Sequence, residues 1–202
     1  MWNIFIEQEL SDNDPAMAGN AKAKLEKNLN KIFSVLPEQA ASKLRALNIY
    51  LLWGEQSTNG GRSSGMSYFR EGEPQRYDYL DPLWNNVIVI YSAKNLMYLD
   101  KLWAQKALMH ELAHAWHINN WPEKYKPIYS AYQQAKQQGL YRNIKNNRAG
   151  VVPDAYALKN ALEYFAELSA MHFVGGNYFP FNAKGLREYD PTGANVIASL
   201  WF

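Results

Sequence analysis

Apolar residues recur every three or four positions in three long segments of the chain, a pattern that predicts helices with buried faces. These segments cover residues 14–35, 93–118 and 160–174, and the second contains a break near Asp100. A pair of glycines ends the third segment. Shorter helices are predicted over 37–47 and 126–138, and a loop with Gly150 and Pro153 is expected before the third long helix.

Three short apolar runs between the first two long helices predict β-strands. They cover residues 48–53, 66–70 and 87–91, and the last of them reads Val-Ile-Val-Ile-Tyr. A glycine- and serine-rich loop, residues 57–65, separates the first two runs. Because the strands are grouped between helices and no repeat is present, the pattern favours an α+β fold.

Composition is that of a globular protein. Of the 202 residues, 48% are hydrophobic and 14% are aromatic, values that argue against a disordered chain. We expect a single domain over 1–202, long enough to bury its own core. The strands and the second long helix belong to one lobe, residues 1–120, and a mainly helical lobe follows over residues 121–202.

Charge and cysteine content narrow the possible partners and ligands. Lys and Arg number 21 against 19 Asp and Glu, and no basic run stands out, so we expect no nucleic-acid partner. No stretch approaches the roughly 20 apolar residues that a membrane span needs. The chain has no cysteine, so a metal ion would depend on histidine and carboxylate ligands.

The N-terminus lacks the basic and apolar segments of a signal peptide. A trimmed mature form would look the same. We favour a secreted or periplasmic protein whose signal segment is absent from this chain, with the cytoplasm as the alternative.

The segment His110-Glu111-Leu112-Ala113-His114 fits the H-E-x-x-H pattern. Its two histidines lie one helical turn apart, so both imidazoles can reach one zinc ion. Glu111 is the only charged residue from 107 to 118, and a buried carboxylate is costly unless a cation lies nearby. We predict one zinc ion per chain, with Glu111 beside it as a proton acceptor. The alternative is a pair of core histidines with a chance glutamate.

The third zinc ligand is expected from the last long helix. Glu163 and Glu167 are the only charges over 161–174, and their spacing puts them on one face. Two buried carboxylates repel each other unless a metal ion and an imidazole compensate them. We assign Glu163 as zinc ligand and Glu167 as hydrogen-bond acceptor for a ligating histidine, with His110 the expected partner. The alternative makes Asn160 a helix N-cap, Glu163 its capping-box partner and Glu167 a solvated charge.

These residues resemble the gluzincin metallopeptidases, in particular the group around anthrax lethal factor and the bacterial Pro-Pro endopeptidases. That group has H-E-x-x-H on one helix and E-[FY]-F-A-E on a later one, and this chain reads Glu-Tyr-Phe-Ala-Glu over 163–167. The longer stretches 110–117, 156–167 and 177–181 are similar to small bacterial metallopeptidase-like proteins. The resemblance covers about residues 65–190.

The resemblance implies a zincin-like fold, in which a small twisted sheet packs on the active-site helix. It implies zinc held by His110, His114 and Glu163, with Glu111 as general base and later proton donor. In that group a tyrosine seven positions before the ligand glutamate hydrogen-bonds the tetrahedral intermediate, and Tyr156 stands at that position here. The implied activity is hydrolysis of a peptide or protein substrate. We favour an endopeptidase because no charged cluster that would bind a chain terminus stands out.

Several assignments keep two readings. His117 shares the helix face of His110 but lies about 10 Å along the axis from it, so it either supports the ligands or packs in the core. The run 66–70 is nominated as an edge strand that pairs with substrate. The loop 57–65 is either a lid or a slack connection. Four tryptophans either line a groove or, as we favour, pack in the core: Trp84, Trp103, Trp116 and Trp121.

Three functions compete with a general endopeptidase. One is an amidase that acts on cell-wall peptide, and another is a toxin-like protease with one narrow target. The third is a catalytically silent binding protein that keeps the zincin scaffold. Glu111 and Tyr156 speak against the third, because a purely structural site needs neither a base nor an oxyanion donor.

Overall fold

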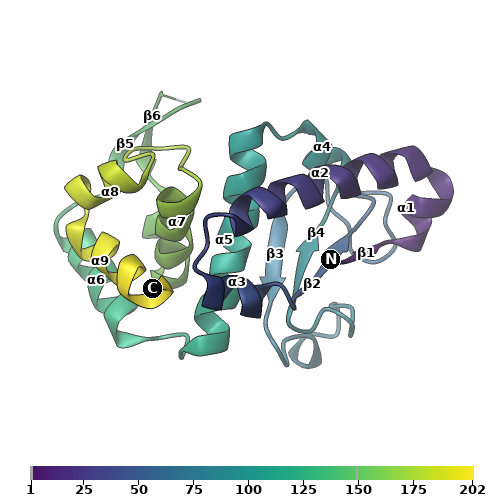
Figure 1. The fold of residues 1–202 in the computed structure, drawn as a ribbon, viewed down its shortest axis with the longest axis horizontal. Helices are drawn as coiled ribbons and strands as arrows, with labels where there is room; N and C mark the ends of the chain where they lie inside the picture. The colour runs from purple at the N-terminus through teal and green to yellow at the C-terminus, as the bar shows by residue number, and fades with distance from the viewer. Residues whose placement is uncertain (1, 149) are drawn as a thin grey trace.

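The computed structural model describes residues 2–148 and 150–202, which form a mixed α+β structure with two lobes (Figure 1). The N-terminal lobe contains β1 (Asn3–Ile6), α1 (Gln8–Asn13), α2 (Pro15–Phe33), α3 (Glu38–Leu44), β2 (Asn48–Leu51), β3 (Met66–Phe69), β4 (Val87–Ile90), α4 (Ala93–Tyr98) and α5 (Lys101–Asn120). The C-terminal lobe contains α6 (Lys126–Gln137), β5 (Arg142–Asn146), β6 (Gly150–Asp154), α7 (Ala161–Phe173), α8 (Ala183–Tyr189) and α9 (Pro191–Trp201).

The sheet of the N-terminal lobe has the strand order β1-β2-β4-β3. β1, β2 and β4 are parallel, whereas β3 runs antiparallel to β4 and forms one edge of the sheet. All four residues of β4 are buried, because both faces of the sheet are covered. Ile88 and Ile90 face the main core with α2 and α5, and Val87 and Val89 face a second core under the segment 70–86.

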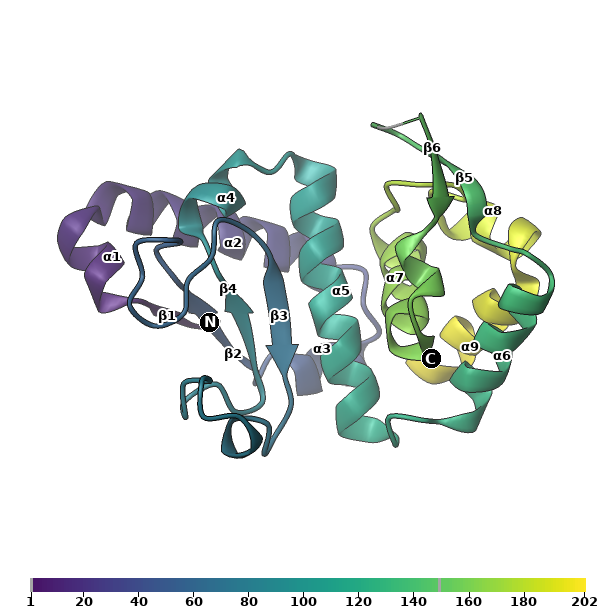
Figure 2. The same cartoon turned by 180° about the vertical axis from the view of Figure 1, so that it is seen from behind.

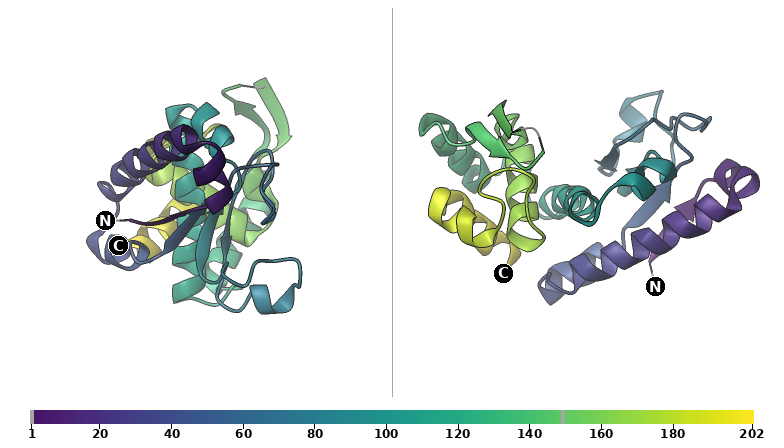
Figure 3. Two further views of the ribbon diagram at one scale, coloured as in Figure 1. Left: turned by 90° about the vertical axis from the view of Figure 1, so that its right-hand side faces the viewer. Right: turned by 90° about the horizontal axis from the view of Figure 1, so that it is seen from above.

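Helix α5 stands between the two lobes and packs against α7 along its length (Figure 2). The Asp100 side chain caps its N-terminus by accepting the N–H of Trp103 at 2.9 Å. The break expected near Asp100 is therefore the junction between α4 and α5. Seen from above, α5 lies nearly end-on between the lobes (Figure 3, right). The main hydrophobic core includes residues of both lobes.

The long helices and three strands of the sequence analysis are confirmed, but several elements were not expected. β1 is only four residues long, with a burial pattern too weak to stand out. The expected loop before α7 is wrong, because β5 and β6 form an antiparallel hairpin there (Figure 3, left). Its strands are mostly exposed, so they carry no strong apolar signal. Within residues 2–148 and 150–202, none of the helices has the length and apolar content needed to cross a bilayer.

Candidate metal centre

Two helices from different lobes bring the predicted ligands together. His110 and His114 lie one turn apart on α5, and Glu163 lies in the first turn of α7. Asn160 starts α7, since its side chain accepts the N–H of Glu163 at 2.9 Å. The N-cap that the alternative reading required is thus present. The Glu163 carboxylate nevertheless turns toward the histidines, where both of its oxygens have partners.

The spacing of the three side chains fits a tetrahedral metal ion. His110 Nε2 lies 3.0 Å from His114 Nε2 and 3.0 Å from Glu163 Oε2, and His114 Nε2 lies 3.2 Å from the same oxygen. A tetrahedral zinc ion with bonds of about 2.0–2.1 Å separates its ligand atoms by about 3.3–3.4 Å. In the part of the chain that the structure describes, these residues form a possible metal-binding triad.

The triad holds a proton tightly in the metal-free protein. Burial opposes a charge on His110, but its hydrogen bonds to Glu163 and Glu167 outweigh burial and raise its pKa to about 10 in the metal-free protein. Burial likewise opposes ionisation of Glu163, yet both histidines hold the pKa of this carboxyl well below its usual range. A metal ion would replace the proton that His110 otherwise carries.

Glu167 lies behind His110, as a supporting acceptor should. Its Oε1 is 2.9 Å from His110 Nδ1, which leaves Nε2 facing the other ligands. Lys106, one turn earlier on α5, places its Nζ 2.8 Å from the same oxygen. Burial would raise the pKa of Glu167, but Lys106 and His110 lower it to about 2. Sequence reasoning missed Lys106, because its partner comes from a distant helix.

Glu111 connects the triad to the edge of the sheet. Its Oε2 accepts the N–H of Tyr68 on β3 at 2.7 Å. The carboxylate is buried, and burial raises its pKa. A carboxylate with a raised pKa, held in a fixed orientation, is suited to accepting and returning a proton.

Tyr156 is placed by a 3₁₀ turn, Tyr156–Leu158, that leads directly into α7. Its hydroxyl lies 3.2 Å from Glu163 Oε1, and its ring centre lies 5.8 Å from that of His110. Burial raises the pKa of Tyr156, so the phenol stays protonated and able to donate a hydrogen bond. Lys159 Nζ lies 2.8 Å from this hydroxyl and 3.0 Å from Glu163 Oε1, a contact that sequence reasoning also missed.

His117 belongs to the core. Its side chain is fully buried, its Nε2 bonds to the Pro122 carbonyl at 3.1 Å, and its ring packs on Phe165. It is not a member of the triad.

The loop 57–65 is tied to the start of the chain, where Glu7 accepts hydrogen bonds from Ser57 and Asn59.

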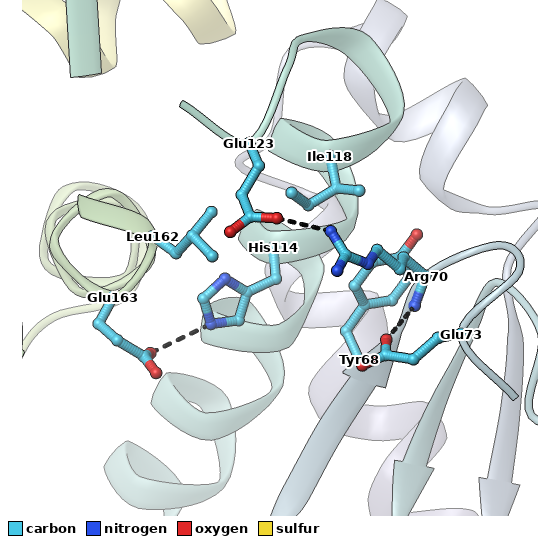
Figure 4. A pocket seen from close by; sticks show the side chains of 8 residues that line it. All are labelled: Tyr68, Arg70, Glu73, His114, Ile118, Glu123, Leu162 and Glu163. Atoms are coloured by element: carbon cyan, nitrogen blue, oxygen red, sulfur yellow. Dashed lines mark hydrogen bonds and ion pairs between the residues drawn. The ribbon is translucent and has the colours of Figure 1, made fainter. Parts of the chain in front are cut away.

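A cavity of about 220 Å³ opens beside the triad, between β3, α5 and the start of α7 (Figure 4). It is lined by Tyr68, Arg70, Glu73, His114, Ile118, Glu123, Leu162 and Glu163. None of the four candidate tryptophans lines it, and Trp84 and Trp116 are buried.

No protein-family model and no curated protein matches this chain. Function is therefore inferred from the residues of the site itself.

Proposed function

We propose that this protein is a zinc-dependent metallopeptidase of the gluzincin type, similar to the group around anthrax lethal factor and the Pro-Pro endopeptidases, and that it acts as an endopeptidase. One observation carries the proposal. His110, His114 and Glu163 meet within hydrogen-bonding distance of one another, next to the buried carboxylate of Glu111. A closed structural zinc site has four protein ligands, whereas three ligands with a neighbouring base are typical of a catalytic site.

The architecture around the triad supports a zincin-like fold. A small sheet packs on the helix that carries both histidines, and its antiparallel edge strand β3 lies against that helix. The third candidate ligand comes from a later helix in the other lobe. These features agree with what the resemblance implies.

A zinc ion bound by the triad would supply a Lewis acid and an activated water for attack on the peptide carbonyl. Glu111 then accepts a proton at its carboxylate and returns it to the leaving amine. The hydroxyl of Tyr156 donates a hydrogen bond to the oxygen on which negative charge develops. Glu167 holds His110 in the tautomer whose Nε2 is free to act as a ligand.

We propose that the substrate main chain pairs with the outer edge of β3 at Met66, because the Tyr68 N–H already donates to Glu111. The Tyr68 N–H points away from β4, since it donates to Glu111. Met66 is two residues away, so its main-chain groups face the same side. An extended peptide can add to such an edge by main-chain hydrogen bonds.

Metal content and peptide cleavage test the proposal together. Elemental analysis is expected to find one zinc per chain, and Glu163→Ala should lose it. Glu111→Gln should retain zinc and lower cleavage of a mixed peptide library by at least about 10²-fold, because it removes the general base. Zinc retention without cleavage of any peptide by the unmodified protein would overturn the proposal and favour a binding protein.

A further inference from the structure

The cavity beside the triad is positioned to hold part of a substrate, an inference that rests on the proposed function. Two triad members, His114 and Glu163, line it directly, and Tyr68 links it to the edge strand (Figure 4). Whatever fills the cavity therefore belongs to a residue next to the bond that is cut. An engineered cavity of about 150 Å³ accepts benzene, so about 220 Å³ is room for one long side chain.

Three residues supply the apolar part of the cavity. They are Ile118 on α5, Leu162 on α7 and Tyr68 on β3 (Figure 4). The Tyr68 hydroxyl is anchored 2.8 Å from Asn86 Oδ1 and 3.1 Å from Asn119 Oδ1. An uncharged aromatic ring held in this way can receive a cation on its face.

The charged part of the cavity carries an excess of negative charge. Arg70 and Glu123 neutralise each other across its mouth at 2.6 Å (Figure 4). Glu73 accepts the main-chain N–H of Arg70 at 3.1 Å. Among the described residues, no cationic side chain forms an ion pair with Glu73. Glu73 thus lies near the Arg70 guanidinium, which is paired with Glu123, and forms no ion pair of its own among the described residues.

We propose that this cavity is a substrate subsite that selects a cationic group beside the scissile bond, with Glu73 as its carboxylate partner and the Tyr68 ring as its aromatic surface. The cation is an ammonium or guanidinium group, supplied either by a lysine or arginine side chain or by the N-terminal amine of the peptide. An acidic group on the substrate is disfavoured, because Arg70 is already paired with Glu123 and the carboxylates of Glu73 and Glu123 line the same cavity.

The test compares matched peptides on three variants. The library first locates the cleavage site, and N-acetylated peptides with Lys, Met or Glu at each position flanking that site follow. The unmodified zinc-loaded protein should prefer Lys over Met by about tenfold in kcat/KM, since a hydrogen bond to a charged partner adds measurable affinity even when partly exposed. Glu73→Gln should reduce this preference below about threefold, and Glu73→Lys should shift it toward Glu.

Glu71→Gln is the matched control. Glu71 has the same charge, lies two residues away and is exposed, but it does not line the cavity. Its variant should keep the tenfold preference. Peptides with a free N-terminus separate the two sources of the cation. If the amine is the bound group, peptides with a free N-terminus are cleaved next to that terminus, acetylated peptides are not, and the activity is that of an aminopeptidase instead of an endopeptidase.

Binding gives a readout that does not depend on turnover. The Lys peptide should bind zinc-loaded Glu111→Gln about tenfold more tightly than the Met peptide, and Glu73→Gln in that background should remove the difference. The subsite would be overturned if the Lys and Met peptides bound equally and acetylation of the N-terminus changed neither affinity, or if a preference for the cation survived Glu73→Gln. Failure of the unmodified protein to cleave any peptide would instead overturn the proposed function, and the binding comparison would still decide the subsite.

Discussion

Replacement of Lys106 by methionine should destabilise the protein markedly. Methionine keeps the length of the side chain and removes the charge. The Lys106 and Glu167 side chains are 11% and 1% exposed, and their charged atoms lie 2.8 Å apart. Loss of Lys106 therefore leaves a buried carboxylate whose remaining charged partner is His110.

The size of the effect follows from this burial. Removal of one member of a buried ion pair costs about 3–5 kcal/mol. His110 still contacts Glu167, so we expect the lower end, about 3 kcal/mol. For a protein of 202 residues each kcal/mol shifts Tm by about 2–4 °C, so Tm should fall by about 6–12 °C.

The loss of stability is measured by denaturant unfolding and by thermal unfolding at pH 7, with the protein kept metal-free by a chelator. Lys101→Met is the control, because Lys101 is exposed on the same helix and has no ion pair among the described residues, so its variant should stay within about 0.5 kcal/mol. Adding Glu167→Gln to Lys106→Met should recover part of the loss, since no buried charge is then left unpaired. A loss below about 1 kcal/mol for Lys106→Met would refute the buried ion pair.

Three further outcomes are expected. The pKa of about 10 for His110 in the metal-free protein means that zinc displaces a proton, so apparent zinc affinity should rise by about tenfold per pH unit between pH 7 and 9. Calorimetry in buffers of different ionisation enthalpy should detect about one released proton, and identical heats would contradict this. Tyr156→Phe should keep zinc and lower kcat by about 10²–10³-fold, whereas a change confined to KM would argue against oxyanion stabilisation. Tyr68→Pro removes the N–H that orients Glu111, so turnover should fall while the edge strand keeps its fold. Unchanged turnover in a folded variant would exclude this role for β3.

The same pKa sets how metal-free stability depends on pH. A raised histidine pKa means that the folded state holds the proton more tightly than the unfolded chain. The contribution of His110 is therefore complete below its ordinary pKa of 6.5 and is lost as pH rises toward about 10. Denaturant unfolding of the metal-free protein should therefore show a free energy of unfolding that falls as pH rises from 6.5 toward about 10.

Periodicity predicted several elements that are buried along their own length, although it did not predict α9, which also has a buried apolar face. The helical segments 93–118 and 160–174 correspond to α4 with α5 and to α7, and the all-buried run of β4 was equally clear. β1 and the β5–β6 hairpin depend on pairing with distant or mostly polar residues, so local patterns do not reveal them.

The site was predictable where its chemistry is encoded within one helical turn. The four-residue spacing of His110 and His114 on α5 is a local pattern, and so is that of Glu163 and Glu167 on α7. The contacts of Lys106 and Lys159 were not predicted, because a single lysine at the end of an apolar segment is ordinarily interpreted as a charge exposed to solvent. The charged lining of the cavity was missed for a related reason. Arg70 and Glu73 come from one segment and Glu123 from another, so only folding brings all three together.

Because the triad is divided between α5 and α7, an ion bound there would join the two lobes of the molecule. Zinc sites in proteins keep their ligand distances within about 0.2 Å of standard values. A hinge-like drift of the C-terminal lobe by even 1 Å would therefore unseat the metal. Zinc retention would therefore depend on how rigidly α5 packs against α7. A mutation that loosens this packing far from the ligands would have the same effect as the loss of a ligand.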